Sequence, residues 1–135
     1  MALDPLALGL PHREPFVFVD EVTELTPGES AAGWKRFPAS EAFFRGHFPG
    51  DPLVPGVILS EALAQIAGIA AGVKDKPLRL TAIKAMKFLA AVRPDEVVTL
   101  HARKLGAVGG LWQFEVRAKV GEAVVAEGAV VLSEA

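Results

Sequence analysis

The chain has 135 residues, a formal net charge of −2 and no cysteine. This length predicts one domain over residues 1–135 with a core that needs no disulfide or metal support, and the small net charge argues against nucleic acid as a partner. The missing cysteine excludes disulfides, thiolate metal sites and cysteine nucleophiles, and with no apolar run of about 18 residues and no signal-peptide pattern we expect a cytoplasmic protein that does not enter a membrane.

The first part of the chain predicts a hairpin followed by a long loop. Residues 16–24 are rich in β-branched and aromatic residues and end near the turn signal Pro27-Gly28, and residues 30–37 are the expected returning strand. Four prolines between residues 38 and 55 exclude a continuous helix or a central strand there. We therefore expect a loop that leads into the segment beginning at Gly56.

Residues 56–73 predict a long helix. The run VILSEALAQIAGIAAGV has apolar residues on nearly every face, which is typical of a buried helix, and its length and alanines favour helix over strand. Its many small residues would let a sheet or another helix approach closely.

The rest of the chain predicts strands at residues 78–89, 96–105, 112–120 and 123–132, with turns at Gly109-Gly110 and Gly121-Glu122. One helix and five or six antiparallel strands predict an α+β fold in which a curved sheet wraps the helix. One sheet covers only part of such a helix, so we expect an apolar stripe that dimerisation would cover.

The loop and the helix carry the candidate functional residues. His47 lies among prolines and glycines that restrict the backbone, and a rigidly held imidazole that titrates near neutral pH suits proton transfer. The alternative is a histidine that only stabilises the loop. Glu61 lies in the second turn of the helix, where it is either a protonated acid in a cavity or a carboxylate in solvent near the helix start. Gln65, four residues on, shares its face and favours the cavity.

The helix start and the other two histidines are further positions to consider. Gly56 should open the helix, and a free amide at that end is a ready oxyanion site. Ser60 has no obvious adjacent base, and we find no cluster of metal ligands, so we expect no metal and no cofactor. We expect His12 to have a structural hydrogen-bonding role and His101 to lie on a strand surface.

The stretch GHFPGDPLVPGVILSEALAQ resembles the signature of the β-hydroxyacyl-[acyl carrier protein] dehydratases of fatty-acid synthesis, Z type. LPHREPFVFVDEV, KFLAAVRPDE and LWQFEVRAKVGEAVVAEG resemble the start and the later strands of that family, so the similarity covers nearly the whole chain. The resemblance implies the hotdog fold, a homodimer or a trimer of dimers, and an acyl carrier protein thioester as substrate. The implied reaction removes water from a 3-hydroxyacyl thioester and leaves the trans-2-enoyl thioester.

The resemblance also implies the site. His47 and Glu61 match the catalytic pair, which in the family comes from opposite subunits, and the Gly56 amide matches the group that binds the thioester carbonyl. We expect Val57 and Gln65 to bind substrate beside it. Asp51 also resembles the related A type, which isomerises as well, but that type has aspartate at the position of Glu61.

Departures from the family pattern lie after the helix. The chain has no tyrosine, so the usual Tyr-Phe pair is missing, and Ala82, Lys84 and Asp95 stand where Gly, Asp and Gly are usual. The nearby basic residues are either a docking patch for an acidic carrier protein or a solvated face: Lys74, Lys76, Arg79, Lys84, Lys87 and Arg93. Alternative functions are a hotdog thioesterase, a CoA-dependent enoyl hydratase and a non-catalytic acyl-binding module.

Overall fold

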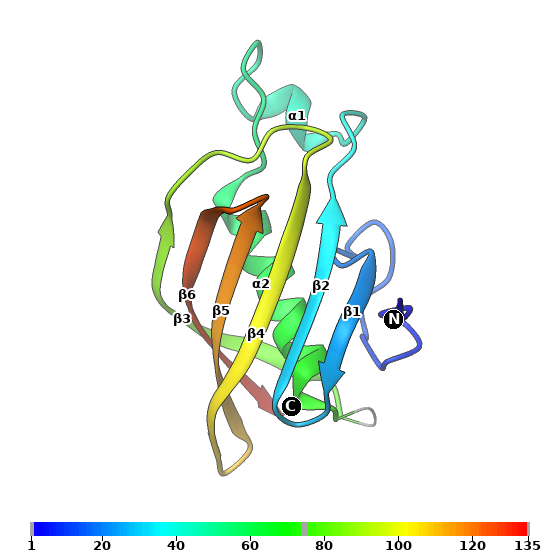
Figure 1. The fold of residues 1–135 in the computed structure, drawn as a ribbon, viewed down its shortest axis with the longest axis vertical. Helices are drawn as coiled ribbons and strands as arrows, with labels where there is room; N and C mark the ends of the chain where they lie inside the picture. Colours follow the sequence, from blue (N-terminus) through cyan, green and yellow to red (C-terminus); the bar gives the residue numbers. More distant parts are fainter. Residues whose placement is uncertain (1, 74–75, 135) are drawn as a thin grey trace.

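The computed structural model describes residues 2–73 and 76–134 and shows an antiparallel sheet wrapped around a long helix (Figure 1). The elements in chain order are β1 (Glu21–Thr26), β2 (Ser30–Arg36), α1 (Phe43–Gly46), α2 (Gly56–Ala71), β3 (Leu78–Phe88), β4 (Val97–Val108), β5 (Leu111–Val120) and β6 (Ala123–Glu134). The six strands lie in the order β1-β2-β4-β5-β6-β3, and all neighbouring pairs are antiparallel. This is the α+β arrangement expected of the hotdog fold.

The long helix α2 begins at the predicted residue, Gly56, and ends at Ala71, two residues before the predicted end. Pro55 precedes it with φ −59°, and Gly72 ends it in the left-handed conformation with φ 70°. The sheet approaches α2 closely at Gly33, where a Cβ would lie 3.3 Å from Ile66 Cδ1 and 2.3 Å from the Glu21 carbonyl oxygen. No helix in the described ranges, 2–73 and 76–134, is long and apolar enough to cross a bilayer.

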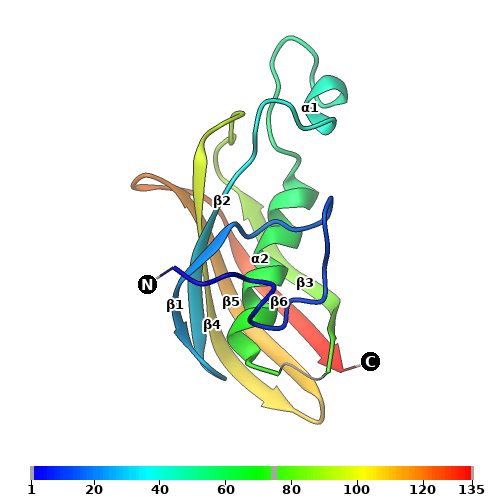
Figure 2. The same cartoon turned by 90° about the vertical axis from the view of Figure 1, so that its right-hand side faces the viewer.

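The first strand begins five residues later than the sequence indicates. Residues 17–19 are buried but irregular, because the Gln65 side chain, rather than a neighbouring strand, binds the backbone there. The Phe18 amide donates to Gln65 Oε1 at 2.8 Å, and Gln65 Nε2 donates to the Phe16 carbonyl oxygen at 3.0 Å. Figure 2 shows this N-terminal segment lying across α2.

The loop between β2 and α2 is tied down at its start by Asp95. This residue adopts φ 69°, the left-handed conformation that a glycine would take most easily. Its amide donates to the Phe37 carbonyl oxygen at 2.8 Å, and its Oδ1 accepts from the Ala39 amide at 3.2 Å and from Arg36 Nη2 at 2.8 Å. The departure from glycine at this position therefore keeps the backbone conformation and adds two side-chain bonds.

Strand β3 forms an apolar edge of the sheet. Its only strand neighbour among the described residues is β6, so its other side presents unpaired backbone groups. Apolar side chains are exposed along and just beyond it: Leu80, Ile83, Phe88 and Leu89. An uncovered apolar edge of this kind is what the expected dimer would bury.

Candidate active site

His47 is held by its own loop. It follows the single turn α1, and its amide donates to the Phe43 carbonyl oxygen at 2.8 Å. Its Nδ1 lies 3.0 Å from the Leu53 carbonyl oxygen, and since a carbonyl only accepts, Nδ1 carries the hydrogen. The bare Nε2 is therefore left to take a proton. The next residue, Phe48, packs edge-on against the imidazole and has φ 63°, a conformation that is uncommon for an aromatic residue and often found at functional sites.

A second contact fixes the same loop to the segment before β4. Asp51 Oδ1 forms an ion pair with Arg93 Nη1, and the Val54 amide donates to the Val92 carbonyl oxygen at 2.8 Å. Two separate segments of the chain thus hold the loop that carries His47.

The N-terminus of α2 opens on a cavity. The amides of Ile58 and Leu59 donate to the Pro55 carbonyl oxygen, so Gly56 and Val57 carry the first amides of the helix, which lack intrahelical acceptors. A Cβ at Gly56 would meet the Phe88 ring at 3.1 Å, so glycine lets this ring lie over the helix start. A cavity of about 300 Å³ is lined by Gly56, Phe88 and neighbouring apolar residues.

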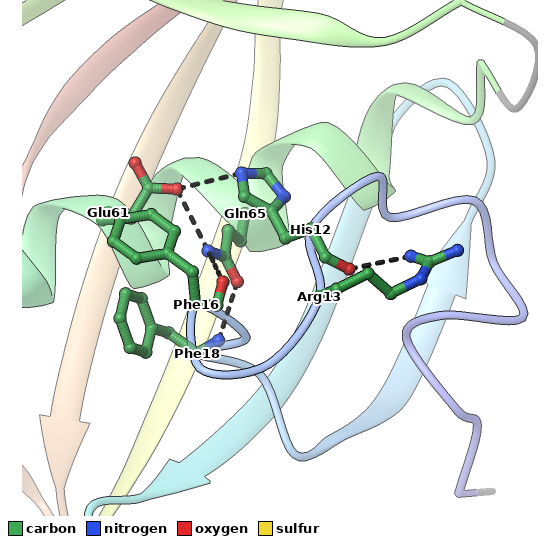
Figure 3. Close-up of polar contacts among 6 residues, drawn as sticks. All are labelled: His12, Arg13, Phe16, Phe18, Glu61 and Gln65. Carbon is green, nitrogen blue, oxygen red and sulfur yellow. Dashed lines mark hydrogen bonds and ion pairs between the residues drawn. The ribbon is translucent and has the colours of Figure 1, made fainter. Parts of the chain in front are cut away.

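Glu61 lies in a polar cluster on one face of α2 (Figure 3). Gln65 Nε2 donates to Glu61 Oε2 at 3.1 Å, which confirms the contact that the i,i+4 spacing predicts. The backbone of Phe16 and Phe18 engages the rest of the Gln65 amide, so its orientation is fixed and its nitrogen faces Glu61. The Glu61 side chain is 20% exposed and lines a cavity of about 400 Å³.

His12, for which the sequence predicted only a structural hydrogen-bonding role, lies beside Glu61. Its Nε2 lies 3.3 Å from Glu61 Oε2, and its ring stacks on Phe16 with the centroids 6.1 Å apart. Its Nδ1 is buried and has no hydrogen-bond partner among the described residues. The local sequence around His12 gave no sign of its contact with Glu61, because this contact joins the N-terminal segment to the middle of the chain.

His47 and Glu61 are not brought into one cavity within a single chain. The cavity beside Glu61 is lined by residues of the N-terminal segment, α2, β3 and β6: Pro11, His12, Glu61, Ala64, Pro77, Leu78, Arg79, Leu80 and Leu132. His47 is not among them, and its loop extends beyond the N-terminal end of α2 (Figure 1). Within the described part of one chain, the two groups therefore line no common cavity.

His101 is exposed on β4, as the alternation of its segment predicts. Desolvation by its neighbours lowers the pKa of His101, and the positive charge of Lys119 lowers it further. It lies on the sheet surface near Arg103 and Arg117, beside a separate hollow of about 290 Å³ that does not include Glu61.

Comparison with known proteins places this geometry in a family. The FabA-like domain matches residues 10–129. The chain therefore belongs to the FabA-like family.

The curated relatives identify the branch as the 3-hydroxyacyl-[acyl-carrier-protein] dehydratases named FabZ. The protein of that name from Ruminiclostridium cellulolyticum is 46% identical over 125 residues, which cover 90% of this chain and 88% of the relative. That from Nitratidesulfovibrio vulgaris strain Miyazaki F is 44% identical and covers 87% and 80%.

Solved structures share the fold at low identity. A chain of the dehydratase heterocomplex ApeI:P from Xenorhabdus doucetiae superposes with a TM-score of 0.81 at 18% identity, covering 97% of this chain and 91% of that one. A hypothetical thioesterase with coenzyme A from Streptococcus pneumoniae gives 0.67 at 13% identity, covering 85% and 84%. These likenesses show the fold, and they do not choose between dehydration and hydrolysis.

Proposed function

We propose that this chain dehydrates 3-hydroxyacyl-[acyl carrier protein] to the trans-2-enoyl thioester in fatty-acid synthesis. The single observation that carries the proposal is the half-buried polar cluster at Glu61, which presents a positioned carboxyl group to a largely apolar cavity. The identity to proteins named FabZ supports the same reaction. The cytoplasm, predicted from composition, is the location that suits it.

The proposed working unit is a dimer. The apolar edge of β3 and the exposed Val57 would pair with the same surfaces of a second copy around a two-fold axis. That arrangement would bring His47 of one subunit to the cavity beside Glu61 of the other. A dimer is the smallest assembly that completes the site, and a trimer of dimers would keep the same pairs.

In the proposed mechanism, His47 Nε2 takes a proton from C2 of the substrate. The amide of Gly56, supported by that of Val57, stabilises the enolate-like thioester oxygen at the positive end of α2. Glu61 delivers a proton to the hydroxyl on C3, which leaves as water, and the C2–C3 double bond forms. Gln65 acts through Glu61, because both hydrogens of its amide nitrogen and its oxygen are already engaged.

Purified protein incubated with a crotonyl thioester tests the proposal. Loss of the enoyl absorbance with formation of the 3-hydroxyacyl thioester, and without release of free thiol, is the expected result. Release of free thiol without hydration would identify a thioesterase instead. A thioester that binds tightly and does not turn over would identify an acyl-binding module. Comparing kcat/KM for carrier-protein and CoA thioesters would then show which of the two acyl carriers the enzyme prefers.

The basic residues near β3 are the candidate docking surface for an acidic carrier protein. Lys76 lies 3.9 Å from Glu134, Arg93 pairs with Asp51, and Lys74 lies outside the described residues. Two of the six cations therefore have an acidic neighbour already. We predict that an acidic carrier protein docks on this surface. A KM that depends strongly on salt for the carrier-protein thioester, but not for the CoA thioester, would support this prediction.

The cavity beside Glu61 predicts a limit on acyl length. Beside it lies a smaller cavity of about 30 Å³ that shares Pro11, Ala64 and Leu78 in its lining and reaches Gly68. Glu61 and Gly68 are seven residues apart, or about 10 Å along the helix at about 1.5 Å per residue. An extended alkyl chain advances about 1.3 Å per carbon, given C–C bonds of about 1.5 Å, so about eight carbons fit between them.

Replacing Gly68 with leucine should therefore shorten the accepted chain. We expect kcat/KM for a twelve-carbon thioester to fall by about tenfold or more, and that for a four-carbon thioester to change less than about twofold. Gly68→Ala is the matched control, since its Cβ would approach only Leu132 Cδ1, at 3.9 Å. Equal losses for both chain lengths in the leucine variant would contradict this placement of the acyl chain.

A further inference from the structure

Two structural features of His12 have no role in the proposed mechanism. Its Nε2 lies 3.3 Å from the oxygen of Glu61 that Gln65 also contacts, and its Nδ1 is buried without a partner in the described part of the chain (Figure 3). Buried polar atoms without partners are uncommon, and each one calls for a physical reason.

The orphaned Nδ1 indicates the protonation state of the ring. A buried N–H without an acceptor is rarer and costlier than a buried acceptor without a donor. The favoured state thus has a bare Nδ1 and a hydrogen on Nε2, which is neutral imidazole. In that state Nε2–H lies near Glu61 Oε2, at an Nε2–Oε2 distance of 3.3 Å that does not yet form a well-aligned hydrogen bond, and such contacts tighten once substrate closes a site.

The charged groups around His12 leave this contact in place. Arg13 turns away, with Nη1 donating to the carbonyl oxygens of Leu10 at 2.9 Å and of His12 at 2.8 Å. Arg79 lines the same cavity from the exposed strand β3, and Lys76 lines the smaller cavity and lies 3.9 Å from Glu134. Glu61 is thus the acidic group that faces the His12 ring.

We propose that His12 is a positioning residue that, as a neutral donor, holds Oε2 of Glu61 together with Gln65 and leaves Oε1 to exchange the proton with substrate. The inference rests on the proposed dehydratase function. Figure 3 shows Oε1 pointing away from both nitrogens. When Oε1 gives its proton to the leaving hydroxyl, negative charge develops on the carboxyl group, and the two N–H donors on Oε2 stabilise it.

This role predicts which kinetic constant changes. The donors act on a charge that forms during the reaction, so their loss lowers kcat and leaves KM nearly unchanged. Because the ring donates without being charged, a neutral amide that reaches the same place can replace it. Glutamine places its Nε2 at about the reach of the imidazole Nε2, whereas phenylalanine keeps the stacking on Phe16 and removes the donor.

The test compares steady-state kinetics of His12→Phe and His12→Gln on the dehydratase substrate. We expect kcat to fall about 10- to 100-fold in His12→Phe with KM within about threefold, since a hydrogen bond to a charged group is lost. We expect His12→Gln to recover kcat to within about fivefold of wild type and to keep the acidic limb of the pH profile. If the phenylalanine variant does not fold, His12→Asn, whose amide is too short to reach Oε2, takes its place.

Four results would overturn the inference. The first three are a folded donor-less variant with full kcat, a loss confined to KM, and a His12→Gln variant that is folded yet as slow as His12→Phe. A shifted acidic limb in His12→Gln would show that His12 acts as a cation instead, and would also overturn it. Inactivity of the wild-type protein would count against the proposed function, so the two failures are distinguishable.

Discussion

Replacing His47 with alanine should lower kcat for the dehydration by about 10²- to 10⁴-fold, the usual contribution of a positioned general base. The loss should appear without unfolding, because the side chain is only half-buried and its hydrogen bond goes to the Leu53 carbonyl oxygen within its own loop. Activity assays on the 3-hydroxyacyl thioester measure kcat, and thermal unfolding shows whether the variant is folded.

Two controls sharpen this prediction. His47→Asn keeps an amide nitrogen at the position of Nδ1 that can donate to the Leu53 carbonyl oxygen but cannot act as a base at neutral pH, so it should be nearly as slow as His47→Ala. His101→Ala removes an exposed histidine from the outer face of the sheet and should leave kcat unchanged. Normal turnover by the folded His47→Ala protein would remove this residue from the mechanism.

Glu61→Gln should produce a loss of similar size, about 10²- to 10⁴-fold in kcat. The amide matches the carboxyl group in shape and keeps the cavity filled, but it cannot deliver a proton to the leaving hydroxyl. It can also turn its NH₂ toward Gln65, which would place two donors face to face and cost stability of about 1 kcal/mol or more. Kinetics and thermal unfolding of the same preparation separate the two effects.

Glu61→Asp is the matched variant for this position. It keeps the carboxyl group but withdraws it by one methylene from the cavity, so we expect partial activity between that of Glu61→Gln and wild type. A folded Glu61→Gln protein with wild-type kcat would exclude Glu61 as the acid, whatever the behaviour of the aspartate variant.

Much of the fold is predictable from the sequence because its signals are local. Pro55 and Gly72 mark the ends of α2, and the apolar run between them indicates a buried helix. The paired glycines at 109 and 110 mark the β4–β5 turn. The predicted strand 96–105 is three residues short at its far end, because a bulge between Lys104 and Gly106 lets β4 continue to Val108 past a glycine that usually weakens strands.

The parts that the sequence misses depend on long-range contacts. The segment 16–19 has the composition of a strand, but a side chain from α2 binds its backbone, and composition carries no trace of that partner. The contact between His12 and Glu61 is of the same kind. The candidate pair His47 and Glu61 was accessible to sequence reasoning, since a histidine in a Pro/Gly loop and a carboxyl group on an apolar helix are each unusual.

The proposed catalysis requires His47 and Glu61 to meet across two chains. Coexpression of differently tagged His47→Ala and Glu61→Ala chains, followed by purification on both tags, yields a mixed dimer for assay. In our account one of its two sites has both residues intact, so it should regain about half of the wild-type activity per dimer while each homodimer stays inactive. A mixed dimer as inactive as its parents would contradict a site shared between subunits.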